Sequence, residues 1–456
     1  MKIRKINRLA WLSTKGVPSI EVQQLKDRLT VFSENVVDDS VTEIRLWEEG
    51  RDLLGVPRQF GLKHHDGDFA IDCTRNEGEI DFPDFKGTLR DYQEKKAVPF
   101  MEELIKNGYG GIIHAKCGGG KTVFILNILS HLKMRTLILL HKTDLMNQWR
   151  GLTDAEADDG KGFGAKKFLG LREAEIGWVK QKVQNWRNLP ITIASYQTVR
   201  SREEELRAQG FFDYFSVVVV DEIHRSSALT YQQVIKLLNP KYHLGATATP
   251  RRADGLQDIF FWNTGPILEK LDVDAPVGSF VQMPWVHPQL RKMNNFSIAI
   301  NRIATNVKRN YHLIGEMIKA HNAGRSVLAM SDRIAQVDFI IQGLRSRVSP
   351  DKKVKIIKFT SGISEKDQIE AKSADFIVGT YKMFGEGTDL PSADTLFFLT
   401  PRGDIEQFVG RIQRVEKGKK ALIVYDMADT GMGILLGLNK KRKKELERMG
   451  FKHGGR

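Results

Sequence analysis

Short apolar runs alternate with longer amphipathic stretches from about residue 110 onward. Each run is continuous and rich in β-branched residues, which is typical of strands buried on both faces of a parallel sheet. The stretches between them, such as 123–132 and 306–321, have the length and spacing of helices. Alternating strands and helices predict a parallel sheet with helices on both faces. The predicted strands are 111–115, 136–141, 191–195, 216–221, 243–247, 326–331, 354–360, 375–380, 395–400 and 421–426.

The predicted strands fall into two series, separated by residues 251–325. Ten strands would strain one domain, so we predict an α/β fold with two tandem parallel-sheet domains, at 87–270 and 271–456. The first 86 residues differ, because hydrophobic and charged residues alternate there in short pieces without a long helical period. They predict a small accessory domain at 1–86, β-rich or α+β.

Composition narrows the class of protein. Hydrophobic residues make up 41% and charged residues 28%, as in ordinary globular proteins, which argues against wholesale disorder. No stretch approaches the roughly 18 apolar residues of a membrane helix, and the first residues lack the apolar core of a signal peptide. The two cysteines, Cys73 and Cys117, are too few for a disulfide framework and fit no zinc site. We expect a soluble, reduced protein of the cytoplasm.

The charge is unevenly distributed along the chain. The net charge of +14 combines −3 over residues 1–86 with +17 over the remainder. Residues 439–456 form a basic C-terminal tail that holds eight basic and two acidic residues. A basic excess on part of the chain predicts a polyanionic partner, with nucleic acid as the default candidate. For the tail itself, a solvated surface is the other interpretation, and composition does not decide between the two.

The segment Ala115-Lys-Cys-Gly-Gly-Gly-Lys121-Thr122 follows a predicted strand and opens a predicted helix, which is the context of a phosphate-binding loop. Its glycines let backbone N–H groups turn toward phosphates, and the helix directs its positive end at them. Lys121 would reach the β- and γ-phosphates, and Thr122 would offer its hydroxyl to Mg²⁺. A glycine-rich turn with an unrelated Lys-Thr pair is the alternative. The predicted nucleotide-binding residues here are Lys116, Cys117, Gly118, Gly119, Gly120, Lys121 and Thr122.

Two adjacent carboxylates, Asp221 and Glu222, end a predicted strand made of four valines. Carboxylates at the end of a buried strand are costly unless a cation or a proton compensates them, and phosphate-bound magnesium would do so. We predict that Asp221 holds the metal through water, while Glu222 orients and deprotonates the attacking water. On its own, Asp-Glu after a strand is also a common turn and cap.

Together with these two sites, further segments resemble the motifs of superfamily-2 helicases and translocases. Asp221-Glu-Ile-His224 resembles the DExH motif II, and the segment 245–250 resembles motif III, which links hydrolysis to strand binding. The extension 251–255 is similar to the branch that contains XPB, type III restriction motors and the phage UvsW helicase. The resemblance spans about residues 89–430 and implies two RecA-like domains. It implies coupling roles for His224, Thr247 and Thr249.

Other motifs of that branch complete the implied nucleotide site. The segment 89–93 resembles its adenine-reading motif, in which the Gln93 amide can pair with adenine and favour ATP. The segment 407–414 resembles motif VI, whose arginines stabilise the γ-phosphoryl group and can be worth roughly 10³–10⁵ in rate. Without the other motifs, these arginines would be interpreted as surface residues of an amphipathic helix. The segment 378–391 resembles motif V of the same branch. The residues implied by these three motifs are Arg90, Gln93, Gly387, Asp389, Gln407, Arg411 and Arg414.

The resemblance also implies strand contacts through small polar groups that hold phosphates without reading sequence. Viewed singly, each of these residues is an ordinary cap or turn residue. Trp149, Trp178 and Phe384 could stack on bases, but isolated aromatic residues usually belong to a core. The implied nucleic-acid contacts are Lys142, Ser195, Gln197, Ser331, Thr360 and Thr380.

The resemblance implies an ATP-driven DNA helicase that uses Mg²⁺, most similar to a small phage helicase of the UvsW type. We expect a monomer that remodels forked or branched DNA with single-stranded regions, with residues 1–86 engaging the substrate, in the host cytoplasm if the chain is phage-encoded. One alternative is an RNA helicase or the motor of a restriction-type complex. Another is a nucleic-acid-binding scaffold with an inactive ATPase, which the intact Lys121, Asp221 and Glu222 disfavour.

Overall fold

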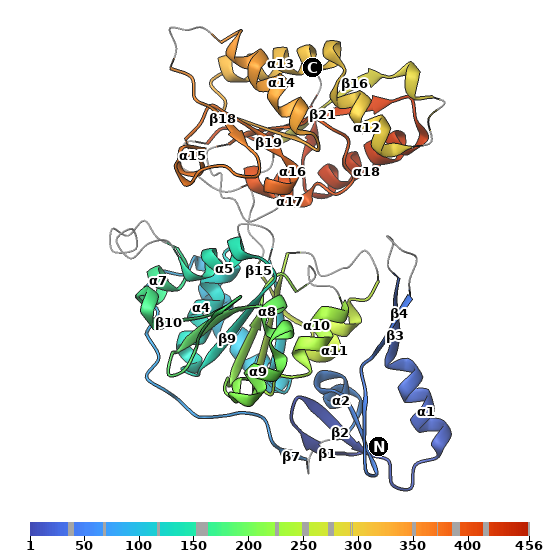
Figure 1. Cartoon of the computed structure of the whole chain (residues 1–456), viewed down its shortest axis with the longest axis vertical. Coiled ribbons are helices and arrows are strands. Elements are labelled where there is room, and N and C mark those ends of the chain that lie inside the picture. Colours follow the sequence, from blue (N-terminus) through green and yellow to red (C-terminus); the bar gives the residue numbers. More distant parts are fainter. Residues whose placement is uncertain are drawn as a thin grey trace. The chain divides into compact units, whose positions relative to one another are not determined.

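Two units make up the computed structural model of the chain, Met1–Val273 and Asp274–Arg456 (Figure 1). No helix among the described residues combines the length and apolar character that crossing a membrane requires. The structure describes residues 1–34, 41–66, 70–115, 119–151, 163–223, 228–248, 255–271, 278–291, 293, 295–348, 353–371, 373–384, 393–413 and 419–454.

The N-terminal part of the first unit is rich in strands, as predicted. Its main sheet has the order β5-β6-β2-β1-β7, while β3 and β4 form a separate antiparallel hairpin. Helix α2 packs against β2 and against α11, where Phe60 meets the edge of Trp262 at 5.6 Å between ring centroids. The elements are β1 (Ile3–Ile6), β2 (Leu9–Ser13), α1 (Ser19–Arg28), β3 (Thr30–Glu34), β4 (Val41–Arg45), β5 (Glu48–Gly50), β6 (Leu53–Pro57), α2 (Arg58–His64) and β7 (Ile71–Asp72).

An eight-stranded sheet in the order β11-β10-β12-β9-β13-β14-β8-β15 forms the centre of the first unit. All its strand pairs are parallel except β10–β11. Its five predicted strands are confirmed, and β10, β11 and β15 were not predicted. The strands are β8 (Gly110–Ala115), β9 (Thr136–Leu140), β10 (Ile176–Lys180), β11 (Val183–Asn185), β12 (Ile191–Ser195), β13 (Val217–Val220), β14 (Tyr242–Thr247) and β15 (Ile267–Leu271).

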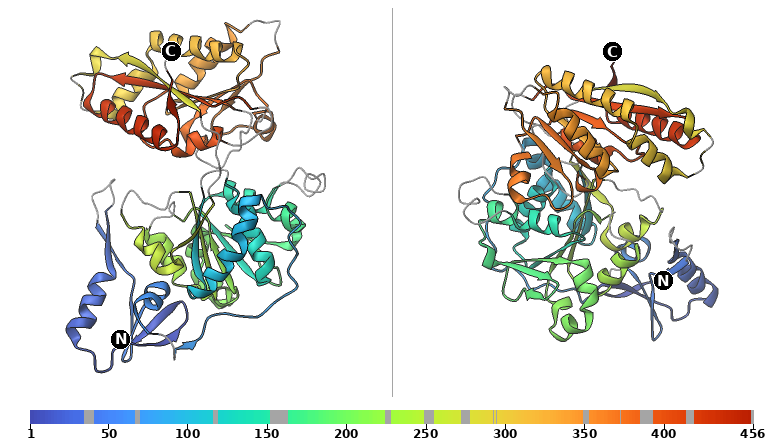
Figure 2. Two further views of the ribbon diagram at one scale, coloured as in Figure 1. Left: turned by 180° about the vertical axis from the view of Figure 1, so that it is seen from behind. Right: turned by 45° about the horizontal axis from the view of Figure 1, so that its top comes forward.

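Helices cover both faces of this sheet (Figure 2). Alternate residues of β9 show the two layers, because Leu137 and Leu139 pack into one hydrophobic cluster while Ile138 and Leu140 pack into another. The first cluster also contains residues of the N-terminal part, which therefore shares its core with the sheet. The helices are α3 (Asp91–Lys106), α4 (Lys121–Leu132), α5 (Thr143–Arg150), α7 (Gly164–Leu169), α8 (Tyr196–Ser201), α9 (Glu203–Ala208), α10 (Ala228–Ile235) and α11 (Asp258–Thr264), with short 3₁₀ turns η1 (Glu173–Glu175) and η2 (Phe211–Asp213).

The second unit contains a fully parallel sheet of seven strands in the order β18-β19-β17-β20-β21-β16-β22. Five of these strands were predicted, and β16 and β22 were not. The strands are β16 (Ser279–Val286), β17 (Val327–Ser331), β18 (Ile356–Phe359), β19 (Phe376–Thr380), β20 (Thr395–Phe398), β21 (Ile423–Thr430) and β22 (Lys452–His453).

The helices of the second unit also lie on both faces of its sheet. Leu313 of α13 and Val337 of α14 belong to the cluster on one face, whereas Val409 of α17 and Leu446 of α18 belong to the cluster on the other (Figure 1). The helices are α12 (Phe296–Ala304), α13 (Val307–Asn322), α14 (Ile334–Arg345), α15 (Glu365–Ala371), α16 (Tyr381–Phe384), α17 (Glu406–Ile412) and α18 (Gly433–Arg448), with a 3₁₀ turn η4 (Pro288–Leu290).

The basic stretch at 439–456 is not an unstructured tail over its described residues. It begins inside α18, and β22 then joins the sheet beside β16. Leu435, Asn439, Arg442 and Leu446 of α18 are buried, at the spacing of one helical face. The Arg442 guanidinium is fully buried and its Nε donates to Asp426 Oδ1 at 2.6 Å. At least one of the basic residues counted there is therefore part of the domain core.

Candidate functional site

Predicted site residues of the first unit follow the carboxyl ends of neighbouring parallel strands. Asp221 and Glu222 come directly after β13, and Thr247 is the last residue of β14. The next strand in the sheet is β8, which leads toward the phosphate loop. Because parallel strands end at the same edge of a sheet, the loop and the two carboxylates lie at one edge, the edge at which α/β sheets bind ligands.

The described end of the phosphate loop has the geometry that a glycine requires. Gly120 has a φ of 70° and stands directly before α4, in the left-handed region. A Cβ at Gly120 would lie 2.5 Å from Nε2 of Gln93. Gly119 and Thr122 are both buried. Lys116, Cys117 and Gly118 lie outside the described residues.

Lys121 and Glu222 form an ion pair at this edge of the sheet. Lys121 Nζ lies 2.7 Å from Glu222 Oε1, and the two side chains are only 11% and 13% exposed. Glu222 has a φ of 48°, which is uncommon for a residue with a Cβ and is concentrated at functional sites. The pair joins the residue predicted to hold phosphate to the residue predicted to orient water.

The Asp221 carboxylate is held from two sides. Its Oδ1 accepts a hydrogen bond from the backbone N–H of Glu222 at 2.8 Å, and its Oδ2 accepts one from Trp149 Nε1 at 2.8 Å. Both Asp221 and Trp149 are buried. Burial raises the pKa of Asp221, while the positive charge of Lys121 opposes that shift.

A buried carboxylate of this kind fits a cation, because a cation would offset the cost of removing the charge from water. Among the described residues, no group of three or more His, Cys, Asp or Glu side chains forms a ready-made metal site. Mg²⁺ next to nucleotides is usually bound by one or two protein groups together with phosphate oxygens, and Asp221 and Thr122 stay the predicted protein ligands.

The predicted adenine-reading residue is tied to the phosphate loop. Gln93 is buried; its Nε2 donates to Gly120 O at 3.0 Å and its Oε1 accepts from the backbone N–H of Arg90 at 3.0 Å. Tyr92 Oη donates to Gly119 O at 3.2 Å. The start of α3 thus braces the loop, a role that the sequence gave no sign of. Pairing of Gln93 with adenine stays a prediction.

The candidate strand contacts of the first unit begin helices at the same edge of the sheet. Lys142 stands at the N-cap of α5, after β9. Ser195 is the N-cap of α8, where its Oγ accepts from Thr198 N at 3.2 Å and donates to Thr198 Oγ1 at 2.8 Å. Gln197 is exposed, and its Nε2 donates to His141 O at 3.1 Å. The capping interpretation of Ser195 is confirmed, and a strand contact by any of the three stays a prediction.

In the second unit, Ser331 and Thr380 are paired in register at the ends of β17 and β19, and Thr360 follows β18. The Ser331 hydroxyl is fully buried, donates to Gln336 Oε1 at 2.6 Å and accepts from Arg333 N at 3.0 Å. Its observed role is therefore to hold the start of α14.

Motif VI is described only in part. Gln407 and Arg411 belong to α17, and Arg411 is buried with its Nε donating to Phe384 O at 3.0 Å. The predicted residues that lie outside the described part of the chain are His224, Thr249, Gly387, Asp389 and Arg414.

The aromatic residues considered for base stacking belong mainly to cores. Phe384 is fully buried and stacks on Phe359, and Trp149 is the buried partner of Asp221. Trp178 is half-buried, with the Arg150 guanidinium 4.5 Å from its ring centroid. The bond from Trp149 to Asp221 was missed, because the two residues are 72 positions apart and only the fold brings them together.

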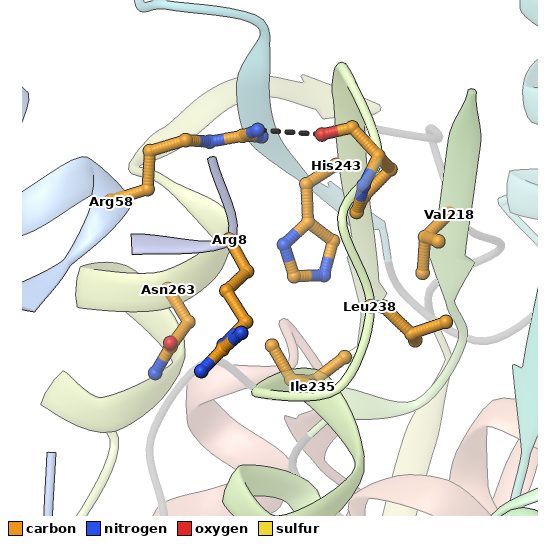
Figure 3. A pocket seen from close by; sticks show the side chains of 8 residues that line it. Arg8, Arg58, Val218, Ile235, Leu238, His243 and Asn263 are labelled. Atoms are coloured by element: carbon orange, nitrogen blue, oxygen red, sulfur yellow. Dashed lines mark hydrogen bonds between the residues drawn. The ribbon is translucent and has the colours of Figure 1, made fainter. Parts of the chain in front are cut away.

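A small pocket lies where the N-terminal part meets β14 (Figure 3). Arg58 Nη1 donates to Pro240 O at 2.6 Å and Nη2 donates to Lys241 O at 3.1 Å. Burial lowers the pKa of Arg58 to about 10 and, together with the charge of Arg58, lowers that of His243 to about 3. His243 is therefore neutral at pH 7, and these contacts fasten the N-terminal part to the sheet. The lining residues are Arg8, Arg58, Val218, Ile235, Leu238, Pro240, His243 and Asn263.

Comparisons with known proteins show similarity to helicases and to a restriction-enzyme subunit. Residues 86–252 match the family model of the type III restriction enzyme res subunit. A protein of Acanthamoeba polyphaga mimivirus, provisionally named ATP-dependent RNA helicase L396, is 25% identical to this chain. The match covers 98% of this chain and 86% of the mimivirus protein. The DNA 3'-5' translocase XPB2 of Sulfurisphaera tokodaii is 25% identical over 74% of this chain and 80% of its own. The comparisons support a superfamily-2 helicase.

Two solved structures share the fold. A fragment of a protein from Vibrio vulnificus YJ016, provisionally assigned as the HsdR subunit of a type I restriction enzyme, has a TM-score of 0.54 at 17% identity, over 75% of this chain and 64% of that chain. The ATP-dependent Type ISP restriction-modification enzyme LlaBIII bound to DNA has a TM-score of 0.51 at 15% identity, over 75% of this chain and 28% of that chain. The predicted fold of two RecA-like α/β domains is confirmed.

Proposed function

We propose that this protein is an ATP-dependent helicase that moves along nucleic acid and unwinds it. The observation that carries the proposal is the ion pair between Lys121 and Glu222 beside the buried Asp221, at the carboxyl ends of β8 and β13. The family match over residues 86–252 supports the same site. Helicases dominate the names of the relatives, which supports coupling of ATP hydrolysis to a nucleic-acid strand.

Three side chains of the first unit divide the work at the nucleotide. Lys121 leaves its ion pair with Glu222 and binds the terminal phosphates instead. Glu222, released from that pair, orients the attacking water and accepts its proton. Asp221, fixed by Trp149 and by the backbone N–H of Glu222, holds Mg²⁺, which neutralises charge on the phosphates when it is bound.

The remaining predicted residues extend this proposal. Arg90 and Gln93 bind the adenine side of ATP. Gln407, Arg411 and Arg414 are the residues proposed to act on the γ-phosphoryl group, because an arginine stabilises the charge that develops in phosphoryl transfer. Lys142, Ser195, Gln197, Thr360 and Thr380, which lie at or after the ends of β9, β12, β18 and β19, hold a strand through its phosphates. Ser331, the last residue of β17, contributes by fixing the start of α14, because its hydroxyl is buried.

We favour DNA as the substrate, in forked or branched form, handled by a monomer in the manner of the XPB and UvsW branch. The name of the XPB2 relative, a DNA translocase, supports DNA. The name of the mimivirus relative, an RNA helicase, makes RNA unwinding the second candidate. The N-terminal part, fastened through Arg58 to the segment that leads into β14, would engage the substrate next to the first unit's sheet.

The variant Glu222→Gln tests the chemistry. We expect ATP binding to be retained and turnover to fall by about 10²–10⁴, because the amide cannot accept the proton of the attacking water. Nucleotide binding and steady-state ATPase rates measure the two effects. Glu203→Gln is the control, because Glu203 is a partly exposed acid of α9 whose partner is Arg207. Hydrolysis by Glu222→Gln at the wild-type rate would refute the role of Glu222.

The substrate is tested by the ATPase rate without nucleic acid and with single-stranded DNA, forked DNA and RNA. The proposal expects stimulation by DNA, greatest with forked DNA, together with strand displacement that requires ATP. Stimulation by RNA alone would replace the DNA proposal by its RNA alternative. An ATPase that responds to none of the four conditions would indicate a scaffold instead.

A further inference from the structure

The exposed side of α18 carries lysines whose charges are not used within the protein. Lys440, Lys441 and Lys444 are exposed, on the side of the helix that faces away from its buried residues. None of the three has an ion-pair partner among the residues that the structure describes. Surface lysines of a helix are commonly offset by acids one turn away, so three that are not offset leave a concentrated positive charge.

The acids of α18 are occupied by other cations of the same helix. Arg448 Nη2 bonds Glu445 Oε1 at 2.5 Å, and it also pairs with Glu406 of α17 at 2.8 Å. Glu447 lies 4.0 Å from Lys443. Glu445 and Glu447 are thus paired with Arg448 and Lys443, and neither forms a described ion pair with Lys440, Lys441 or Lys444.

Buried hydrogen bonds fix the rotation of α18 about its axis. Arg442 stands between the lysines in sequence and points inward, where its Nη2 donates to Met427 O at 3.1 Å and to Asn439 Oδ1 at 2.6 Å. Asn439 Nδ2 in turn donates to Asp429 O at 2.8 Å. Because these bonds hold the inner face, the lysine side chains are held on the outer face. A charge array that is already in place loses less entropy on binding.

Lys441 lies beside the segment that follows β20, which leaves the sheet at the edge where strand contacts are predicted. Arg442 Nη1 donates to Arg402 O at 3.1 Å, and a Cβ on Gly403 would lie 3.4 Å from Cδ of Lys441. Arg402 and Gly403 follow β20, the neighbour of β17 in the sheet. Ser331 ends β17 at this same edge, since all strands of this sheet are parallel. Through Lys441, the lysine surface therefore reaches the segment that follows β20.

We propose that Lys440, Lys441 and Lys444 bind the phosphate backbone of duplex DNA next to the unwinding site. This inference rests on the proposed function. Duplex DNA is favoured over a single strand by charge density: the three lysines span about 6 Å along the helix, and duplex DNA carries one charge per roughly 1.7 Å against 3.4 Å for one strand. Lysine acts as a point charge, so the contact is independent of base sequence.

The test replaces the three lysines together, as Lys440→Gln, Lys441→Gln and Lys444→Gln, in the full-length protein. Binding of a fluorescent 30-base-pair duplex and of a single strand is measured between 50 and 200 mM salt. Each lost phosphate contact should lower the slope of log affinity against log salt by about 0.9 and weaken duplex binding about eightfold at 0.1 M salt. The control triple variant is Lys308→Gln, Lys319→Gln and Arg345→Gln, which removes the same charge from exposed positions of α13 and α14.

A loss of duplex affinity with a slope lower by about two to three, seen in the α18 variant and not in the control, would support the inference. Its ATPase rate without nucleic acid should equal that of the wild type, because none of the three lysines belongs to the proposed nucleotide site. If the α18 variant binds duplex DNA unchanged, or loses affinity for single strands alone, the α18 inference is overturned. The proposed function then still stands, provided that the wild-type protein binds and unwinds nucleic acid. A wild-type protein without affinity for nucleic acid would overturn both.

Discussion

The hydrogen bond from Trp149 to Asp221 can be removed with little change of shape. Trp149→Phe keeps an aromatic ring in the core and deletes the indole N–H that lies 2.8 Å from Asp221 Oδ2. The indole is 1% exposed and the carboxylate 5%, so water does not readily replace the lost donor. A hydrogen bond to a charged group is worth about 1.5–3 kcal/mol. We expect the free energy of unfolding of the first unit to fall by about that amount, with a smaller loss from packing.

The same variant should change the metal requirement of the ATPase. The proposed function assigns Mg²⁺ to Asp221, and a group that orients a metal ligand is typically worth about 10–100-fold in metal affinity. We therefore expect the Mg²⁺ concentration that gives half-maximal ATPase to rise by about that factor. Binding of the nucleotide without Mg²⁺ should stay close to wild type, because Trp149 has no predicted contact with the phosphates.

Denaturant unfolding and ATPase titrations with Mg²⁺ measure these two effects. Trp186→Phe is a matched control, because Trp186 is also buried but is surrounded by the rings of Phe211, Tyr214 and Phe215. It should lose stability through packing without a change in the Mg²⁺ requirement. If Trp149→Phe behaves as Trp186→Phe does in both measurements, the bond does not position Asp221 for the metal and the reasoning fails.

Two further predictions follow from buried geometry. Asp429 is fully buried and pairs with Arg309 at 2.7 Å. Burial by itself raises the pKa of Asp429, but the charge of Arg309 helps to bring this pKa below its ordinary value. Asp429→Asn should lower the free energy of unfolding, measured with urea at pH 7, by about 3–5 kcal/mol. The difference from wild type should shrink below about pH 4, because a carboxylate with a lowered pKa loses its contribution to stability as it is protonated. A difference that stays constant from pH 7 to pH 3 would contradict the lowered pKa of Asp429. Gly120→Ala should weaken ATP binding at least about tenfold, because its Cβ would meet Gln93 in addition to the left-handed strain of 1–2 kcal/mol. Gly210→Ala is the control, because Gly210 has a φ of 74° with open space around it and its replacement adds left-handed strain without a clash. Equal ATP affinity of the two variants would exclude an effect of the clash between the new Cβ and Gln93.

The strands that could be predicted are those with both faces covered. All residues of β9, β12, β13 and β14 are buried, so their sequences are continuous apolar runs that a local pattern detects. The missed strands lie toward the edges of the sheets and are partly exposed, as in β15 and β16. Their mixed sequences, ILEKL and SFVQMPWV, carry no continuous run, because solvent accepts polar side chains on one side.

The amino-acid sequence by itself determined the features that act through neighbouring residues: the buried strands, the glycine turn before Lys121, and the carboxylates that end β13. Backbone conformation and apolar periodicity are local properties, so they can be recognised without the fold. Only the tertiary structure decided which distant groups meet. Strand order places Lys121 against Glu222 across 101 positions, and packing turns Arg442 inward while its lysine neighbours stay outside. Such pairings depend on which strands are adjacent and which helix face is covered, and these are settled by burial over the whole domain rather than by any one segment.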